Sequence, residues 1–255
     1  MKIGIIQGRL SPPTEGFQDT PKDWRREFDL LPKLGLNHIE WVITKESFED
    51  NPLFTEDISA YTDKVSAICA DNLVNKKFHQ SSFLDNNLGK ICYFARQYKI
   101  KNVVIPLLEE SSISNYSKRV LFEKELVRFA KKYPEINFLC EIEEDFLLAK
   151  DMANLASNIY LVYDTGNING LGYDHKIYIK SVFNKIKNVH LKDRLKNTNQ
   201  TLPPGKGNTD FKSIFNTLKD LNYDGLYTMQ TAREVEGKEE ITITKHKKHF
   251  EKEYE

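Results

Sequence analysis

The chain has 255 residues, 40% of them hydrophobic, and its 37 Lys and Arg residues balance its 37 Asp and Glu residues. This length suits one β/α barrel, the hydrophobic content argues against disorder, and the balanced charge excludes a strong overall attraction to nucleic acid or anionic membrane. The N-terminus has no basic stretch followed by a long apolar run, and the three cysteines are widely spaced, as buried thiols in a reducing compartment would be. We expect a cytoplasmic protein without nucleic-acid or membrane partners, and a homodimer is compatible with the sequence.

The apolar pattern switches repeatedly between a period of two, typical of strands, and a period near 3.6, typical of helices. Strands are predicted at Lys2–Gly8, His38–Ile43, Val65–Ala70, Asn102–Leu108, Ile136–Ile142, Tyr160–Thr165, the first half of Lys187–Arg194, and Leu226–Ala232. Helices are predicted at Asp23–Leu34, Ile58–Thr62, Leu84–Tyr98, Ser117–Tyr133, Asp145–Ala156, Asp174–Asn184, Asp210–Leu221 and Lys238–Tyr254. The segments Arg9–Thr20 and Lys196–Asn208 are predicted loops, and Ile241–Thr244 could instead be extended.

Eight strands that alternate with helices predict an α/β fold, a single parallel eight-stranded (β/α)8 barrel over residues 1–255, with 238–255 as a C-terminal helical segment. An open doubly wound sheet is the competing architecture, and it would carry a glycine-rich first turn. Gly4, Gly8 and Gly16 do not form that fingerprint.

Four successive predicted strands each carry one polar, metal-competent residue near the C-terminal end: Glu141, Asp164, His190 and Gln230. In barrels of this kind the C-terminal strand ends form the active-site mouth. Each residue also has a simpler interpretation. These are a structural ion pair for Glu141, an Asx-turn or helix cap for Asp164, a satisfied core histidine for His190, and an ordinary hydrogen-bonding role for Gln230.

Taken together, the four residues offer two carboxylates, one imidazole and one amide oxygen. This donor set predicts one divalent ion (Mn, Mg, Co or Zn) in an open site, whereas a closed structural zinc site would use thiolates. The segment from Asp164 to Asn167 is predicted to turn sharply, with Gly166 able to adopt a positive φ.

A resemblance follows from five segments of the chain. Residues 1–12 (MKIGIIQGRLSP), 39–41 (IEW), 163–167 (YDTGN), 188–194 (NVHLKDR) and 229–233 (MQTAR) resemble the sugar phosphate isomerase/epimerase group of the xylose isomerase-like TIM barrel superfamily. The resemblance implies the barrel fold and one divalent metal held from strands five to eight. It assigns those ligand roles to Glu141, Asp164, His190 and Gln230.

The chain departs from part of this family at its last predicted strand. Ketose 3-epimerases of the superfamily use two metal-bound glutamates to remove and return a proton, and Gln230 cannot exchange a proton in that way. One base, Glu141, suffices for aldose–ketose isomerisation through an enediol, and Lys192 is a second predicted catalytic residue. Another acid, such as Glu40, Asp193 or a water, would restore epimerisation.

Several further residues are predicted to bind the substrate. A phosphate or carboxylate would need one or two basic groups near the mouth, although single rim cations are usually solvated. The predicted substrate-binding residues are Arg9, Glu40, Asn167, Asp193, Arg194, Lys206 and Arg233.

These observations predict a metal-dependent enzyme of carbohydrate metabolism that isomerises or epimerises a sugar or sugar phosphate, with Glu141 as the base. Two alternatives remain. An endonuclease-type hydrolase of abasic DNA on the same fold would need about three metals and a basic groove. A catalytically impaired sugar-binding barrel would keep the pocket without the chemistry.

Overall fold

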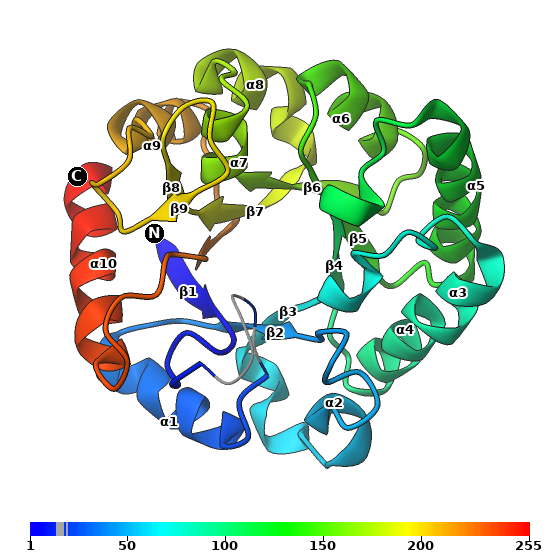
Figure 1. Ribbon diagram of the computed structural model, residues 1–255, viewed down its shortest axis with the longest axis horizontal. Coiled ribbons are helices and arrows are strands. Elements are labelled where there is room, and N and C mark those ends of the chain that lie inside the picture. Colours follow the sequence, from blue (N-terminus) through cyan, green and yellow to red (C-terminus); the bar gives the residue numbers. More distant parts are fainter. Residues whose placement is uncertain (14–17, 19) are drawn as a thin grey trace.

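The computed structural model describes residues 1–13, 18 and 20–255. Eight parallel strands close into a barrel in the order β1-β10-β7-β6-β5-β4-β3-β2, and helices surround it (Figure 1). The predicted (β/α)8 fold is therefore confirmed. No helix among the described residues is long and apolar enough to cross a membrane.

The strands are short and begin and end close to their predicted positions. They are β1 (Lys2–Ile6), β2 (Ile39–Val42), β3 (Val65–Cys69), β4 (Asn102–Leu107), β5 (Asn137–Ile142), β6 (Ile159–Asp164), β7 (Ile186–Leu191) and β10 (Leu226–Met229). In the parallel register, His190 of β7 pairs with Asp164 of β6 on one side and with Thr228 of β10 on the other. The chain order of the strands thus brings the polar strand ends to one rim of the barrel.

The helices follow local signals in the sequence. Helix α1 ends at Gly35, which adopts a left-handed conformation with φ 61°, and the Asn115 side chain accepts a hydrogen bond from the backbone N–H of Lys118 at the start of α5. The helices are α1 (Trp24–Leu34), α2 (Pro52–Thr55), α3 (Ser81–Asn86), α4 (Leu88–Gln97), α5 (Tyr116–Lys132), α6 (Phe146–Ala153), α7 (Thr165–Gly170), α8 (His175–Val182), α9 (Phe211–Asp220) and α10 (Glu239–Tyr254). Short 3₁₀ turns lie at η1 (Ser59–Lys64), η2 (Asp71–Leu73), η3 (Glu109–Ser111) and η4 (Phe183–Lys185).

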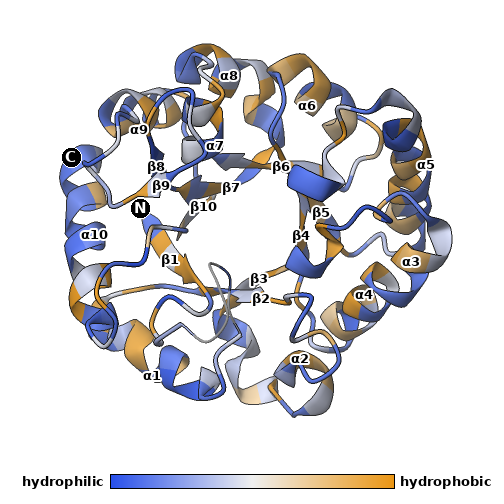
Figure 2. Cartoon of the chain, viewed as in Figure 1, coloured by the Kyte–Doolittle hydropathy of each residue, from blue (hydrophilic) through white to orange (hydrophobic). Residues whose placement is uncertain are grey.

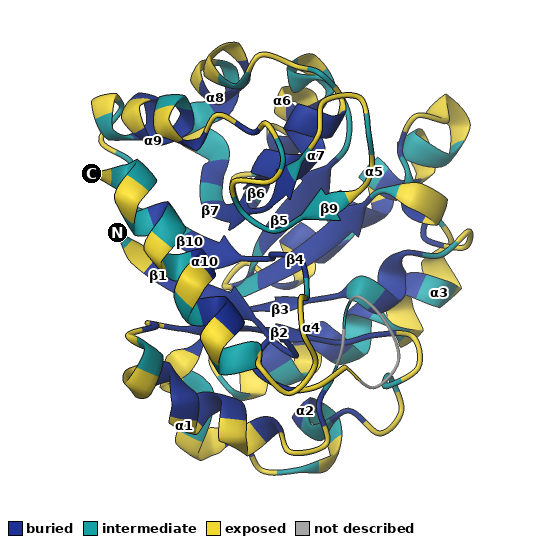
Figure 3. Ribbon diagram, turned by 60° about the vertical axis from the view of Figure 1, so that its left-hand side comes forward, coloured by how far each residue is buried: buried dark blue, intermediate teal, exposed yellow. Residues whose placement is uncertain are grey.

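The hydrophobic core has two parts. The larger part fills the space between the strands and the helices, where the strands and parts of the helices are hydrophobic (Figure 2). The smaller part fills the inside of the barrel with Ile6, Val42, Ala67, Cys69, Val104, Leu139 and Val162. The strands are almost entirely buried, whereas the helices alternate buried and exposed residues (Figure 3). The interior is packed, so open space for a ligand lies above it, at the mouth.

Four details differ from the sequence-based expectation. The predicted helix Leu84–Tyr98 is two helices, because Asn87 separates α3 from α4 and its side chain donates to the carbonyl of Phe83. The predicted loop Lys196–Asn208 contains β9 (Thr201–Leu202), which pairs antiparallel with β8 (Asp193–Arg194). The predicted short helix Ile58–Thr62 is instead the 3₁₀ turn η1, and Gly166 lies inside α7 instead of in a turn with positive φ. Residues 241–244 are helical in α10, as the predicted helix Lys238–Tyr254 requires.

Two other expectations concern the loop after β1 and the cysteines. Of the predicted loop Arg9–Thr20, residues 14–17 and 19 lie outside the described residues. All three cysteines are free and buried, as predicted. They are Cys69, Cys92 and Cys140.

Candidate metal centre

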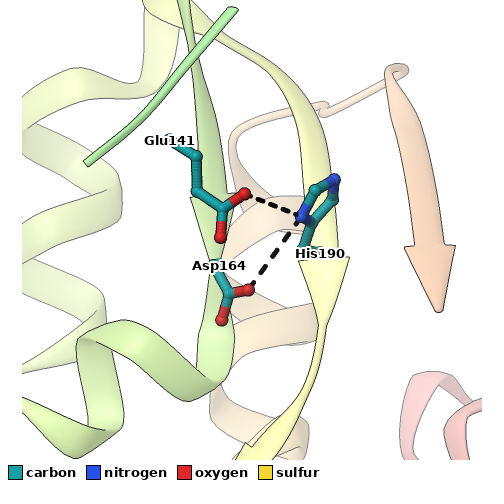
Figure 4. Close-up of side chains that lie close together, drawn as sticks. All are labelled: Glu141, Asp164 and His190. Atoms are coloured by element: carbon teal, nitrogen blue, oxygen red, sulfur yellow. Dashed lines mark ion pairs between the residues drawn. The ribbon is translucent and has the colours of Figure 1, made fainter. Parts of the chain in front are cut away.

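Three polar side chains from neighbouring strands meet at the mouth of the barrel. Glu141 lies near the end of β5, Asp164 ends β6, and His190 lies near the end of β7. One ligand atom from each lies within 4.8 Å of the other two, and all three residues are buried. Figure 4 shows the two carboxylates directed at the same edge of the imidazole.

The imidazole nitrogen that faces the carboxylates has no hydrogen bond. Nδ1 of His190 lies 3.5 Å from Oε2 of Glu141 and 4.0 Å from Oδ2 of Asp164. The nitrogen is buried and finds no hydrogen-bond partner among the described residues. A buried polar atom in this state costs free energy unless a ligand satisfies it, so the arrangement favours a bound cation.

Gln230 follows β10 directly, on the other side of His190. Its backbone N–H donates to the carbonyl of Leu191 over 3.1 Å, which ties the end of β10 to β7. Its side-chain Oε1 is buried and has no hydrogen-bond partner in the described part of the chain. Gln230 thus offers a second unsatisfied buried atom, a neutral oxygen donor, at the same rim.

The charges in the centre support one another. Burial lowers the pKa of His190, but the carboxylates of Glu40 and Glu141 outweigh burial and raise it above its ordinary value. Burial likewise opposes ionisation of Glu141, but the nearby positive charges of His190 and Lys192 outweigh it and lower the pKa of that carboxyl. Without a metal, His190 therefore carries a proton where a cation would otherwise sit.

Asp164 has two roles, because each of its carboxylate oxygens has a different partner. Oδ1 caps α7 by accepting a hydrogen bond from the backbone N–H of Asn167 over 2.8 Å. Oδ2 faces His190 and forms an ion pair of 2.8 Å with Lys192. The helix cap and the metal-facing position, which the sequence presents as alternatives, therefore coexist in one residue.

Asn167 and Lys192 hold the carboxylates in place. The side-chain amide of Asn167 donates to Oε1 of Glu141 over 3.0 Å, and Nζ of Lys192 donates to Oδ1 of Asn167 over 3.3 Å. Lys192 is 4% exposed, and its buried ammonium group is paired with the carboxylate of Asp164. These contacts fix the direction of Glu141 before any substrate arrives.

Glu40 supports His190 from inside the barrel. Nε2 of His190 donates to Oε2 of Glu40 over 3.1 Å, and the amide of Asn188 donates to the same oxygen over 2.8 Å. We predicted Glu40 as a substrate-binding residue, but its side chain is fully buried and is not among those lining the cavity at the mouth. We therefore assign Glu40 to orienting His190, a common arrangement behind metal-binding histidines.

Replacing Glu40 with glutamine should weaken metal binding by about tenfold or more, because the carboxylate that orients His190 and increases its basicity is lost. Titration of the metal-free protein with Co²⁺ measures this change. The exposed variant Glu49→Gln is the control and should bind as the parent does. An affinity within twofold of the parent would contradict the orienting role.

A cavity of about 330 Å³ adjoins the centre at Glu141. Glu141, Lys192 and Gln230 form part of its lining, together with Arg194, which pairs with Glu143 over 3.3 Å. Sequence reasoning missed Lys45, Asp71 and Glu143 in this lining. Each lies in a loop or turn after a strand, where side chains no longer alternate between two faces. The sequence pattern therefore does not show which of them face the cavity, and only their position after a strand end indicates it.

The remaining predicted substrate-binding residues lie apart from this lining. Arg9 and Arg233 line a second cavity of about 190 Å³, where Arg9 donates to the carbonyl of Thr231. Asp193 accepts hydrogen bonds from the backbone N–H groups of Gly205, Gly207 and Thr209. Lys206, on the same loop, is exposed. The hydrogen bonds of Asp193 thus stabilise the loop that carries Lys206.

The residues present fit a divalent cation. They combine carboxylate oxygens, an imidazole nitrogen and an amide oxygen, and the nitrogen and the amide oxygen are buried without hydrogen bonds within the described residues. Such a set suits a divalent ion with open positions, and it includes no thiolate.

Comparison with known proteins is consistent with this geometry. Residues 131–251 match the family described as "Xylose isomerase-like TIM barrel". The inosose dehydratase of Clostridium tetani (strain Massachusetts / E88) is 33% identical over 84 residues, which are 26% of this chain and 28% of that relative. The chain thus matches well under a third of this curated relative.

Solved structures resemble the whole chain in fold. The IolI protein with a bound zinc atom superimposes with a TM-score of 0.77 and 17% identity, covering 100% of this chain and 98% of that one. D-psicose 3-epimerase of Clostridium cellulolyticum H10, solved with D-tagatose, gives a TM-score of 0.70 and 12% identity, covering 100% of both chains. At these identities the likeness establishes the fold alone.

Proposed function

We propose that this chain, a (β/α)8 barrel that matches the xylose isomerase-like TIM barrel family over residues 131–251, is a divalent-metal-dependent isomerase or epimerase of a sugar or sugar phosphate. The observation that carries the proposal is the buried nitrogen of His190, which faces Glu141 and Asp164 without a hydrogen bond, next to a cavity that Glu141 and Gln230 line. A centre built only for stability would satisfy that atom.

Glu141 is the proposed base. Its carboxylate lines the cavity, and its lowered pKa keeps it ionised at neutral pH, so it can accept a proton from the carbon next to a substrate carbonyl. Asn167 holds its other oxygen and limits its rotation. When bound, a divalent ion would polarise the carbonyl and stabilise negative charge that develops on oxygen.

Lys192 and Arg194 are the proposed groups for the anionic parts of the substrate. Both line the cavity, and both are held by carboxylates, Lys192 by Asp164 and Arg194 by Glu143. Lys192 contacts Asn167, which also holds the base, and is the proposed group for an enediolate oxygen, whereas Arg194 is the proposed group for a phosphate.

Gln230 decides between the two reactions. An amide cannot exchange a proton as a glutamate does, so isomerisation with Glu141 as the single base needs no further group, whereas epimerisation needs a second one.

Dehydration is a second candidate, because four of the curated relatives are named inosose dehydratase. It would begin with the same proton removal by Glu141 and then expel a hydroxyl group.

The nuclease alternative is weaker. It would need about three metals, and the part of the chain that is described contains one group of three metal-competent residues.

Elemental analysis and deuterium exchange together test the proposal. The purified protein should contain about one divalent ion per chain, as one ligand set requires. With ketoses such as D-tagatose and L-ribulose in deuterated water, it should incorporate deuterium next to the carbonyl and form an isomer or epimer. Metal without any exchange would indicate the non-catalytic sugar binder, and a dehydrated product would indicate the second candidate.

A further inference from the structure

The proposed function leaves one role unassigned, and this inference rests on that function. If the chain epimerises a sugar, a group other than Gln230 must return the proton. Glu40 is occupied below His190, and Asp193 accepts three backbone hydrogen bonds in its loop. Neither is among the residues that line the cavity.

Asp71 is a half-buried carboxylate in the cavity lining. It begins η2, two residues after the end of β3, and it lines the cavity with Glu141, Lys192 and Gln230. The carboxyl of Asp71 forms no hydrogen bond or ion pair with the described residues. Carboxyl groups that are buried to this extent usually have such a partner. Its carboxyl is therefore available to a substrate in the cavity.

The strand order places Asp71 on a different wall from the base. In the barrel, three strands separate β3 from β7 in either direction, so Asp71 lies across the mouth from His190. One strand, β4, separates β3 from β5, which carries Glu141. A substrate at the centre of the mouth would therefore meet Glu141 and Asp71 from two different walls of the barrel.

The other acids of the lining are less suited to this role. Glu46 and Glu109 are exposed at the rim, and Glu143 pairs with Arg194. Burial, followed by the negative charge of Glu141, raises the pKa of Asp71 to about 6, with Lys45 opposing this and Glu109 and Glu46 adding to it. A carboxyl with a pKa near neutrality can both hold and release a proton at the pH of the reaction.

We propose that Asp71 is the second proton-transfer residue, acting on the substrate from a different wall of the barrel than Glu141 does. Glu141 takes the proton from the carbon next to the carbonyl, and the electron pair of that C–H bond forms the enediolate. The carboxylic acid of Asp71 then gives its proton to the same carbon from the other side, and the carbonyl forms again with the configuration inverted. The proton left on Glu141 returns to Asp71 through water, so the cycle needs no other reactant.

The test separates proton removal from inversion. The Co²⁺-loaded protein is incubated in deuterated water with D-tagatose and with L-ribulose, and NMR follows two quantities, deuterium in the recovered substrate and formation of the epimer. In Asp71→Asn, we expect deuterium exchange to remain within about tenfold of the parent, while epimer formation falls by about 10²-fold or more. Glu141→Gln should lose both.

Controls distinguish this result from a folding defect. Asp71→Asn should keep the thermal midpoint and the Co²⁺ affinity of the parent, and Asp71→Glu should recover part of the epimer formation. Asp29→Asn, an exposed aspartate of α1, should behave as the parent. Epimer formation by Asp71→Asn within tenfold of the parent would overturn the role of Asp71. Absence of exchange in the parent would instead overturn the proposed function, and the role of Asp71 with it.

Discussion

Replacing Glu141 with glutamine should lower turnover by about 10²–10⁴-fold, the usual contribution of a positioned general base. The same change should weaken metal binding, because one of the carboxylates facing His190 is lost. Glutamine keeps the shape of the side chain and can still meet the amide of Asn167, so the fold should persist. Steady-state turnover and Co²⁺ titration measure the two effects.

A nearby variant provides the control for Glu141. Glu144 lies just past β5 and is not part of the cavity lining, so Glu144→Gln should leave turnover and metal binding at the level of the parent. If Glu141→Gln kept both near that level, the centre would not be the site of reaction.

Metal uptake by the metal-free protein should release about one proton per ion near pH 7. In the metal-free state, the neighbouring carboxylates raise the pKa of His190, so the imidazole is protonated, and the metal needs the neutral form. Glu141 has a lowered pKa and is already ionised, so it contributes no proton. The affinity should therefore increase with pH, by up to about tenfold per unit while His190 remains protonated.

Calorimetric titration in buffers of different ionisation enthalpy measures this proton release. The charged groups that face His190 are Glu40, Glu141 and Asp164, and removing the charge of Glu40 should reduce the release at neutral pH. His249→Gln, on α10, removes a histidine that is neither in the cavity lining nor in the group of three metal-competent residues, and it should leave the release unchanged. A metal affinity independent of pH between 6 and 8 would show that His190 is not a ligand.

Much of the fold follows from the sequence because strand periodicity survives in a parallel barrel. The polar residues at Glu141, Asp164 and His190 interrupt otherwise apolar strands, and the barrel topology places successive strand ends side by side. The resemblance to xylose isomerase-like barrels is confirmed by the family match over residues 131–251, which contains three of the five segments that carry it, 163–167, 188–194 and 229–233.

The sequence predicts which face of a strand a side chain lies on more readily than its height along the barrel axis and the residues that it contacts. Glu40 points into the barrel, as its alternation with apolar neighbours indicates, but only coordinates show that it lies under His190. Asp71 follows its strand in a turn, where no side-chain period exists. The sequence pattern places Asn87 inside a helix, and only its contacts with Asn72 and Phe83 show that the helix is interrupted there.

The neutral amide of Gln230 affects both the affinity of the proposed centre for its metal ion and the Lewis acidity of the bound ion. An uncharged oxygen donor attracts a cation less than a carboxylate would, so we expect the proposed centre to give up its metal to chelators more readily than one with a glutamate there. The same lack of a negative charge leaves the ion less neutralised and therefore a stronger Lewis acid. The protein would thus bind its metal less tightly, but the bound ion would polarise the substrate carbonyl more strongly.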